Sequence, residues 1–273
     1  MRASSVRTLA TMVAAVDKDL GKASEKDGTQ VAEELFALSD LFDSNIRLTR
    51  NLSDPARTAV DKQALVTKIF QGNLSAPVLD GVMALAAGRW STEADLGEAA
   101  RILGKHVLLK TAQDNGKLDD VERDIFAMGQ VIGKNRELRN FLTDSHRAPA
   151  NERIETFNKL IGEKVEPLAL RLVDAVIERA LPGHLGADIR ALLDSAAQLR
   201  SRAMATIYTA APLSDTQQSR LVNLLSKRAG HDVVVNVVVD PSLIGGVKIR
   251  RGDVVVDGAV STRAAEFRRK LAS

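Results

Sequence analysis

Cysteine is absent from the 273 residues, so the chain can form no disulfide, no thiolate metal site and no cysteine nucleophile. Histidine is scarce, and no two of its four copies have the spacing of metal ligands on one helix. No glycine-rich phosphate motif precedes a predicted helix, and no G-x-S-x-G sequence occurs. We therefore expect no metal, no cofactor and no catalytic residue.

Aromatic residues make up only 3% of the chain, whereas hydrophobic residues in total make up 45%. The core must therefore consist mainly of Leu, Val, Ile and Ala, the usual material of helical bundles. Few side chains are available to stack on single-stranded nucleic acid. The net charge is +3, and from Thr206 onward there are 10 Lys/Arg against 6 Asp/Glu. A basic helical nucleic-acid-binding module stays open as an alternative function, although this basic character is weak for one.

Long hydrophobic runs are also lacking: no stretch of 18 apolar residues occurs, so no membrane-spanning segment is predicted. The first 20 residues carry two arginines and a short apolar stretch, but no small-x-small cleavage site follows. Their apolar residues fall three or four apart, which predicts an amphipathic helix with one apolar face: Val6, Leu9, Val13, Val16 and Leu20.

An internal repeat is present at an offset of 90 residues. Residues 31–90 align without gaps with residues 121–180, and 11 of the 60 positions are identical. Several identities are residues that begin or end helices or turns: Asn45 with Asn135, Asp54 with Asp144, Gly72 with Gly162, and Pro77 with Pro167. Phe36 with Phe126 and Arg89 with Arg179 also match. Each copy has helical periodicity, with Val121, Ile125, Met128 and Ile132 on one face, and one long helix from about Ser91 to Asn115 joins the two copies.

The last quarter of the chain changes to a pattern of strands. Ala203–Thr209 predicts a strand, and Ser214 with Gln217 has the spacing of a capping box at a helix start. The segment "HDVVVNVVVD" predicts a buried or central strand because it is almost entirely β-branched, and Gly252-Asp253 predicts a hairpin turn. A last helix is expected from Ser261. The fold class is therefore mainly α: two tandem six-helix-type bundles (1–105 and 106–205) and a small β-α-β-β-β-α module (206–273).

The glycines near the C-terminus are interpreted as turn residues. A phosphate site needs glycines between a strand and a helix, but Gly245-Gly246 leads into another strand. We expect Asp240-Pro241 to begin a turn that Gly245-Gly246 closes, and Gly252 and Gly258 to interrupt strands. The basic run Arg268, Arg269 and Lys270 fits either a solvated helix end or a contact with an acidic partner.

The segment from Val239 to Leu271, "VDPSLIGGVKIRRGDVVVDGAVSTRAAEFRRKL", contains these glycines and the basic run. It resembles the C-terminal signature of the delta subunit of F-type ATP synthases, the oligomycin-sensitivity-conferring protein family. The matching residues include Asp240, Pro241, Gly245, Gly246, Gly252, Asp253, Asp257 and Gly258. Ala259 stands where the family usually has Ser. The resemblance covers about Lys105 to Ser273, and the additional N-terminal copy is similar to the longer actinobacterial form with a duplicated helical domain.

This resemblance implies a non-catalytic stator subunit. It would join the catalytic head to the peripheral stalk at the cytoplasmic face of the cell membrane and resist rotation during ATP synthesis. The implied partners are the N-terminal helices of the head's alpha subunits, held by the helical part, and a b-type stalk subunit, held by the C-terminal module. A head-binding groove is expected at Leu108, Leu109, Leu168, Leu172 and Val176, unless these residues simply fill the bundle core. Arg268, Arg269 and Lys270 are the expected stalk contact.

Overall fold

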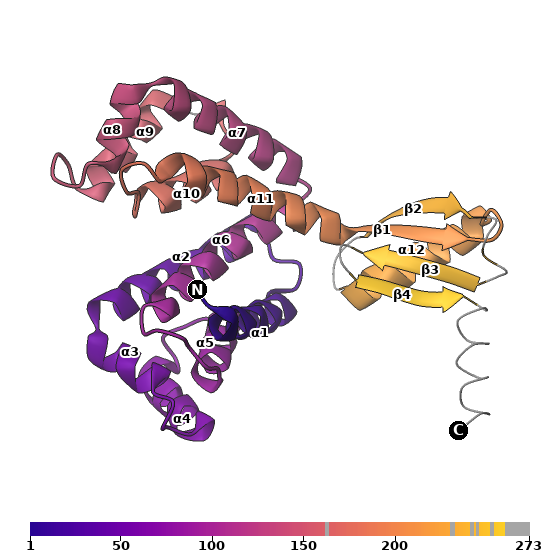
Figure 1. Ribbon diagram of the computed structural model, residues 1–273, viewed down its shortest axis with the longest axis horizontal. Helices are drawn as coiled ribbons and strands as arrows, with labels where there is room; N and C mark the ends of the chain where they lie inside the picture. Colours follow the sequence, from indigo (N-terminus) through magenta and orange to yellow (C-terminus); the bar gives the residue numbers. More distant parts are fainter. Residues whose placement is uncertain (162–163, 230–232, 241–242, 244–245, 252–253, 260–273) are drawn as a thin grey trace. The chain divides into compact units, whose positions relative to one another are not determined.

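The computed structural model describes residues 1–161, 164–229, 233–240, 243, 246–251 and 254–259. The chain divides into two compact units, Met1–Ser195 and Ala196–Ser273. In the described residues the first unit is helical, whereas the second contains a sheet, one whole helix and the end of the helix that leads into it (Figure 1). The predicted mainly helical fold with a small C-terminal α/β module is confirmed.

The helical unit follows the predicted repeat. Helices α1–α6 make the first copy and α6–α11 the second, so both copies use α6. The helices are α1 (Ala3–Leu20), α2 (Glu25–Ser44), α3 (Ile46–Ser53), α4 (Ala59–Phe70), α5 (Ala76–Ala87), α6 (Asp95–Asp114), α7 (Leu118–Lys134), α8 (Arg136–Thr143), α9 (Ala150–Ile161), α10 (Pro167–Ile177) and α11 (Leu185–Ala203). The bounds of α3 and α8 differ by 90 residues at both ends, and α2, α4 and α5 correspond to α7, α9 and α10.

The two copies share their helix-start chemistry. The side chain of Asn45 accepts a hydrogen bond from the Leu48 amide at 3.1 Å, and that of Asn135 accepts one from the Leu138 amide at 3.0 Å. Each asparagine thus satisfies one of the free amides at its helix N-terminus. Pro77 and Pro167 lie in the first turns of α5 and α10, where a missing N–H is tolerated.

A carboxylate also occupies the same place in both copies. Glu34 on α2 accepts a hydrogen bond from the Ser75 amide at 2.8 Å, and Asp124 on α7 accepts one from the Glu166 amide at 2.7 Å. Both amides stand just before the helix that follows, so the negative charge also faces a positive helix end. These two bonds fix the second and fifth helices of each copy against each other.

The predicted apolar stripe of α7 is confirmed: Val121, Ile125, Met128 and Ile132 are each at most 1% exposed. The predicted stripe of α1 was partly wrong, because Val6 is 52% exposed. Ser5 and Thr8 lie on the buried face instead, and they bond to the turn between α5 and α6: Thr8 Oγ1 donates to the Arg89 carbonyl at 3.0 Å. Hydroxyl groups satisfied in this way can be buried, so hydrophobicity alone misplaced the face.

The helix between the copies is α6, and it ends as predicted before Gly116, which has a φ of 72°. It begins at Asp95, later than expected, and no side chain caps its N-terminus. The predicted domain boundary after residue 105 falls inside α6, and the one after residue 205 falls inside strand β1 (Met204–Thr209). The division of the chain into three domains stays a prediction.

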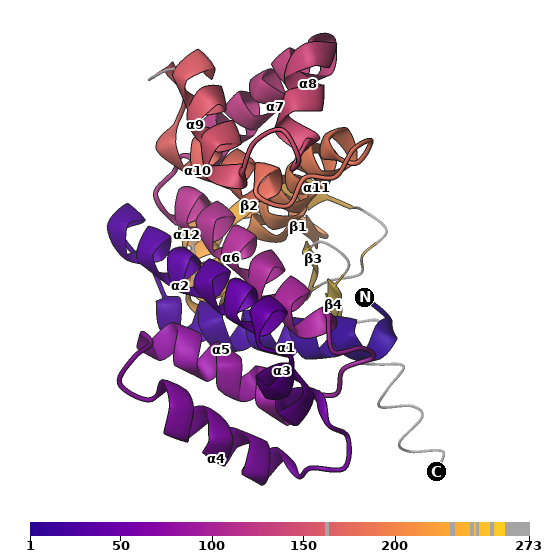
Figure 2. The same cartoon turned by 90° about the vertical axis from the view of Figure 1, so that its left-hand side faces the viewer.

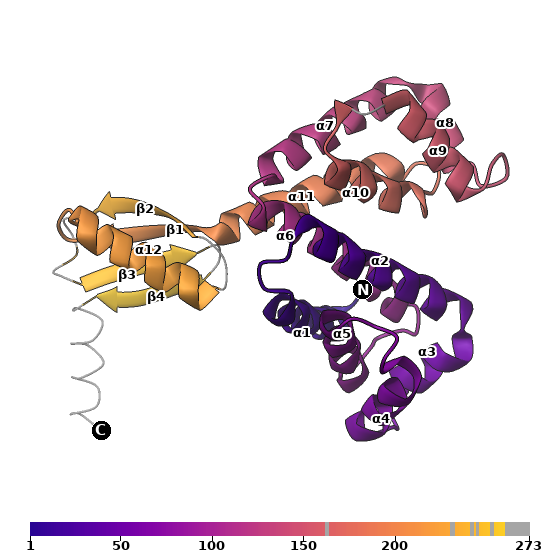
Figure 3. The ribbon, with the colours of Figure 1, turned by 180° about the vertical axis from the view of Figure 1, so that it is seen from behind.

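The C-terminal unit has a four-stranded sheet in the order β2-β1-β3-β4, with β2 (Val234–Val239), β3 (Gly246–Arg251) and β4 (Val254–Ala259). Strand β1 runs parallel to β2, as the crossover through α12 (Asp215–Ala229) requires, and antiparallel to β3. Helix α12 lies across one face of the sheet (Figure 3). The predicted capping box is confirmed at its start, where Ser214 Oγ accepts from the Gln217 amide and Gln217 Oε1 accepts from the Ser214 amide.

Two expectations for this unit need correction. Strand β2 is not central but lies at the sheet edge, where Val238 and Val239 are 37% and 44% exposed. Its β-branched run reflects strand propensity rather than burial on both faces. Gly258 does not interrupt a strand, because it lies within β4 and pairs with Val247. The last helix predicted from Ser261 lies outside the described residues.

Candidate partner-binding surfaces

The five residues predicted to form a head-binding groove are buried. Leu108 and Leu109 lie on α6, and Leu168, Leu172 and Val176 lie on α10. None is more than 6% exposed. They therefore belong to the core of the helical unit, and their role in binding the head stays a prediction.

Helix α2 of the first copy packs more extensively against α6 than against any other helix, and Figure 2 shows the two side by side. Glycines permit this approach. A Cβ atom added at Gly104 would lie 2.6 Å from Phe36 Cε1, and one added at Gly97 would lie 2.3 Å from Asp43 Oδ1. One added at Gly28 would meet Thr111 Oγ1 at 2.0 Å. All three distances are well below van der Waals contact, so only glycine fits this seam without movement of a neighbour.

Helix α2 also contacts α10 of the second copy, through Arg171. The Arg171 guanidinium donates to the Glu33 carboxylate, with Nη2 and Oε2 3.0 Å apart, and lies 4.4 Å from the centre of the Phe36 ring. The same group forms an ion pair with Glu178 at 3.1 Å. The Arg171 side chain is 21% exposed, which strengthens these charge interactions relative to open solvent.

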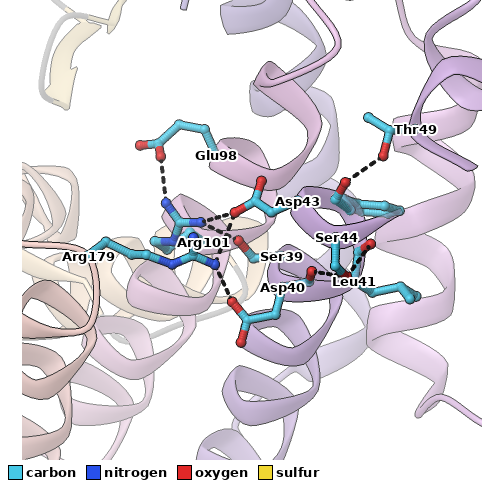
Figure 4. A network of polar contacts seen from close by, with 10 residues as sticks. Ser39, Asp40, Leu41, Asp43, Ser44, Thr49, Glu98, Arg101 and Arg179 are labelled. Atoms are coloured by element: carbon cyan, nitrogen blue, oxygen red, sulfur yellow. Dashed lines mark hydrogen bonds and ion pairs between the residues drawn. The ribbon is translucent and has the colours of Figure 1, made fainter. Parts of the chain in front are cut away.

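A second polar network also joins the copies, as Figure 4 shows. Asp43 on α2 forms ion pairs at 3.0 Å with both Arg101 on α6 and Arg179, which follows α10. Arg101 also donates to Ser39 Oγ at 2.6 Å, and Arg179 to Asp40. The two arginines therefore hold α2 from two segments, helix α6 and the turn that follows α10. Networks of this kind contribute more than isolated surface pairs.

These inter-copy residues were not predicted from the sequence. The offset of 90 marked Arg179 as a position that both copies share, but its carboxylate partners are more than 130 residues away in the chain. Glu33 and Glu34 are adjacent on α2 but have different partners: Glu33 accepts from Arg171, and Glu34 accepts from Ser75 Oγ.

Two carboxyl groups lie close to this joint: Asp174, which is buried, and Glu178, which is half-buried. Burial raises the pKa of Asp174, which accepts a hydrogen bond from Asn158 Nδ2 at 3.0 Å. Burial also raises the pKa of Glu178, although Arg171 opposes that effect. Among the described residues, no group of three or more His, Asp or Glu side chains is placed to hold a metal ion.

The face of the first copy that corresponds to α6 and α10 is formed by α1 and α5. A shallow hollow lies there, lined by small side chains and two arginines: Ser4, Arg7, Thr8, Thr11, Ala84, Ala87, Gly88 and Arg89. Both arginines are exposed. Arg89 is the repeat equivalent of Arg179, which in the second copy binds the carboxylates of α2.

In the C-terminal unit, the family-type turn is partly visible. The Asp240 amide donates to the Thr209 carbonyl at 2.8 Å, and the Asp240 carbonyl accepts from the Leu243 amide at 3.1 Å. Gly246 has a φ of 85° at the start of β3, which only glycine adopts readily. Asp257 and Gly258 lie in β4, opposite Lys248 and Val247. Pro241, Gly245, Gly252, Asp253, Arg268, Arg269 and Lys270 lie outside the described residues.

Residues 106–271 match the family model described as "ATP synthase delta (OSCP) subunit". The chain belongs to this family. A delta subunit from Salinispora arenicola is 38% identical over 88% of each chain, and one from Streptomyces griseus is 35% identical over 90% of each chain. One from Corynebacterium aurimucosum is 32% identical over the full length of both chains. The match to the family model begins within α6, so it covers the second helical copy and the C-terminal unit, whereas these relatives align with the first copy as well.

Membership in the delta (OSCP) family makes the chain a subunit of ATP synthase and leaves the nucleic-acid alternative without support. None of the helices in the described part of the chain is long and apolar enough to cross a membrane.

Proposed function

We propose that this delta-family chain joins the catalytic head of an F-type ATP synthase to its b-type peripheral stalk and keeps the head from turning with the rotor. It would act at the cytoplasmic face of the cell membrane and would have no catalytic activity of its own. The observation that carries the proposal is the family match over residues 106–271. The packing of the helical unit is a second reason, because it bears on how the chain would transmit force.

A stator must transmit torque without yielding, and the joint between the two copies suits that task. Glycines let α2 approach α6 closely, and Arg101, Arg171 and Arg179 bind carboxylates on α2. Packed interiors have low compressibility and transmit strain. The two copies are therefore proposed to move together rather than to bend relative to each other.

The head is proposed to dock on the exposed face of α1 and α5. In the second copy, the equivalent helices α6 and α10 are already covered by α2, whose Glu33, Asp40 and Asp43 face arginines. The proposed partner therefore resembles helix α2: it is an amphipathic helix with carboxylates beside its apolar stripe. Arg7 and Arg89 would receive such carboxylates on the first copy. The N-terminal helices of the alpha subunits are proposed to supply these carboxylates.

The stalk is proposed to bind the C-terminal module, with Arg268, Arg269 and Lys270 contacting acidic residues of the b-type subunit. Two sites on one chain raise the effective concentration of each partner for the other. Two sites on one chain therefore favour a stable link between head and stalk even if each binding affinity is low.

Calorimetric titration of the full chain with two peptides tests the proposal: the alpha subunit's N-terminal segment and the b-type subunit's C-terminal segment. We expect both to bind at separate sites. The double variant Arg7→Glu/Arg89→Glu should weaken the alpha peptide on the order of 10-fold or more, because two attractive charges become repulsive. Arg47→Glu, an exposed arginine on α3, is the matched control and should leave both affinities unchanged. If neither peptide bound, the stator function would have to be abandoned.

A further inference from the structure

Asn158 on α9 and Asp174 on α10 form a buried polar pair in which only one side of each group is satisfied. Asn158 Nδ2 donates to Asp174 Oδ2 at 3.0 Å. The remaining oxygens, Asn158 Oδ1 and Asp174 Oδ1, are both buried and have no hydrogen-bond partner among the described residues. Asp174 as a whole is 8% exposed. Buried polar atoms nearly always have a partner, so two unpartnered acceptors in one pair need an explanation.

A single proton on Asp174 Oδ1 would satisfy both atoms. A protonated carboxyl group has an O–H donor beside a carbonyl oxygen, and the Asn158 amide has an N–H donor beside its own oxygen. The two groups can therefore form two parallel hydrogen bonds, one from Nδ2 to Oδ2 and one from Oδ1 of the acid to Oδ1 of the amide. If Asp174 were ionised, two acceptors would be buried without a donor, and one of them would be charged.

The environment of Asp174 favours the protonated form. Burial is the main cause that raises the pKa of Asp174, and the Glu33 carboxylate on α2 raises it further. The Asn158 amide and the Arg171 guanidinium act in the opposite direction. Arg171, however, is already bound by Glu33, with Nη2 and Oε2 3.0 Å apart, and by Glu178 at 3.1 Å.

Charged groups on the other helices that contact α10 have partners of their own. Arg101 on α6 pairs with Asp43 at 3.0 Å. Asp124 on α7 accepts from the amide that precedes α10, at 2.7 Å. On α9, Lys159 pairs with Glu155 at 2.6 Å, and both side chains are exposed. The two cations are therefore not free to neutralise an ionised carboxylate on α10.

We propose that Asp174 holds a proton in the folded chain, in a two-bond pair with the Asn158 amide, and that loss of this proton weakens the contact between α10 and α2. Arg171 connects the two events. It lies one turn before Asp174 on α10, and its Nη1 atom is buried without a hydrogen bond although Glu178 is 3.1 Å away. An ionised Asp174 would attract this guanidinium along α10 and draw it away from Glu33 on α2. The neutral acid leaves the contact between Arg171 and Glu33 undisturbed.

The first copy lacks this proton site. The residues 90 positions before Asn158, Arg171 and Asp174 are Lys68, Gly81 and Ala84. The first copy therefore forms its helices without the amide, the arginine and the acid, so these three side chains are not required for the helical fold itself. They occur together in the copy whose α10 contacts α2 of the other copy through Arg171.

Carbon-13 NMR of the full chain, labelled at the aspartate carboxyl carbons, tests the first part of the proposal. The signal that disappears in Asp174→Asn belongs to Asp174. We expect it to keep the chemical shift of a protonated acid at a pH well above 3.8, the ordinary value for aspartate. A carboxylate signal from Asp174 over the whole pH range in which the chain stays folded would overturn the proposal.

The coupling between Arg171 and Glu33 tests the second part. It is measured by urea unfolding of Arg171→Leu, Glu33→Gln and the double variant at two pH values, one on each side of the Asp174 titration. We expect the coupling to fall by roughly half at the higher pH, because Arg171 is then shared with an additional carboxylate. In the matched control background, Asp174→Asn, an amide replaces the protonated acid and keeps both hydrogen bonds, so the coupling should be the same at both pH values. A coupling that does not change with pH in the original background, or one that falls equally in both backgrounds, would refute the link between the proton and the contact.

Discussion

Replacing Gly104 by alanine tests how much the close approach of α2 to α6, the helix that both copies share, stabilises the helical unit. The added Cβ atom would lie 2.6, 2.9 and 3.1 Å from Cε1, Cδ1 and Cζ of Phe36. Carbon atoms normally rest about 3.5–4.0 Å apart, so the ring must retreat by about 1 Å. The Phe36 ring is 6% exposed and lies 4.4 Å from the Arg171 guanidinium, so its movement also disturbs the contact with α10.

Two opposing effects set the change in the free energy of unfolding. Alanine favours a helix over glycine by about 1 kcal/mol, whereas overpacking a core typically costs about 1–3 kcal/mol. Gly133→Ala on α7 isolates the first effect, because nothing lies within 4 Å of its added Cβ atom. We therefore expect Gly104→Ala to be less stable than Gly133→Ala by about 1–3 kcal/mol, the overpacking cost alone. Gly129→Ala, whose added atom would lie 3.1 Å from Ile189, should fall between them.

Urea unfolding followed by the fluorescence of Trp90 measures this difference. Trp90 is the only tryptophan, and its indole donates to the Leu85 carbonyl at 3.0 Å in the first copy, so the signal reports the unit in question. Equal stability of Gly104→Ala and Gly133→Ala would refute the reasoning, because it would mean that α2 can move away from α6 at no cost.

Three further predictions concern the charged residues of the helical unit. Arg153 is 3% exposed and donates to the Leu142 and Ile177 carbonyls at two helix ends. Arg153→Met should therefore lower the unfolding free energy by about 2–4 kcal/mol. A loss smaller than that of a surface arginine variant would contradict this. Burial raises the pKa of Asp174 in the folded state, so its stabilising contribution is complete below the unfolded pKa and is lost as the pH rises through the folded pKa. Asp174→Asn should therefore gain stability relative to the wild type as the pH rises above 3.8, the ordinary value, and urea melts that give a pH-independent difference would disprove it. A double-mutant cycle of Arg171→Leu and Glu33→Gln should give a coupling of about 0.5–1 kcal/mol that shrinks in 1 M salt; a coupling insensitive to salt would assign the contact to packing.

Much of the fold could be predicted because its signals are local. Asn45 and Asn135 cap helices, Pro77 and Pro167 begin them, and Ser214 with Gln217 forms the expected capping box. Each of these residues acts within four positions of itself, so a sequence pattern contains all that is needed. The offset of 90 then gave the tandem arrangement of the helices.

The contacts between the copies could not be predicted in this way. Arg171 finds Glu33 across 138 residues, and whether α2 rests on α10 depends on packing that no spacing encodes. The face of α1 was partly misjudged for a related reason: Ser5 and Thr8 are buried by bonds to a turn more than 80 residues away. The five apolar residues of α6 and α10 were placed in the right helices, but the pattern could not tell a groove from a core, because both are apolar.

Duplication did not give this chain two equivalent docking faces. The face of α6 and α10 in the second copy is covered by α2, so the equivalent face that stays exposed belongs to α1 and α5 of the first copy. Its opposite end, on α7 and α11, has lost the acidic groups that Glu33, Asp40 and Asp43 provide in the first copy. These substitutions remove the carboxylates that arginines of another molecule would need at this end. Restoring two of them with Arg123→Glu/Gln130→Asp should therefore let Arg7 and Arg89 of a second molecule bind there. Sedimentation velocity should then detect more concentration-dependent association for the variant than for the wild type, and equal association of the two would contradict this reasoning.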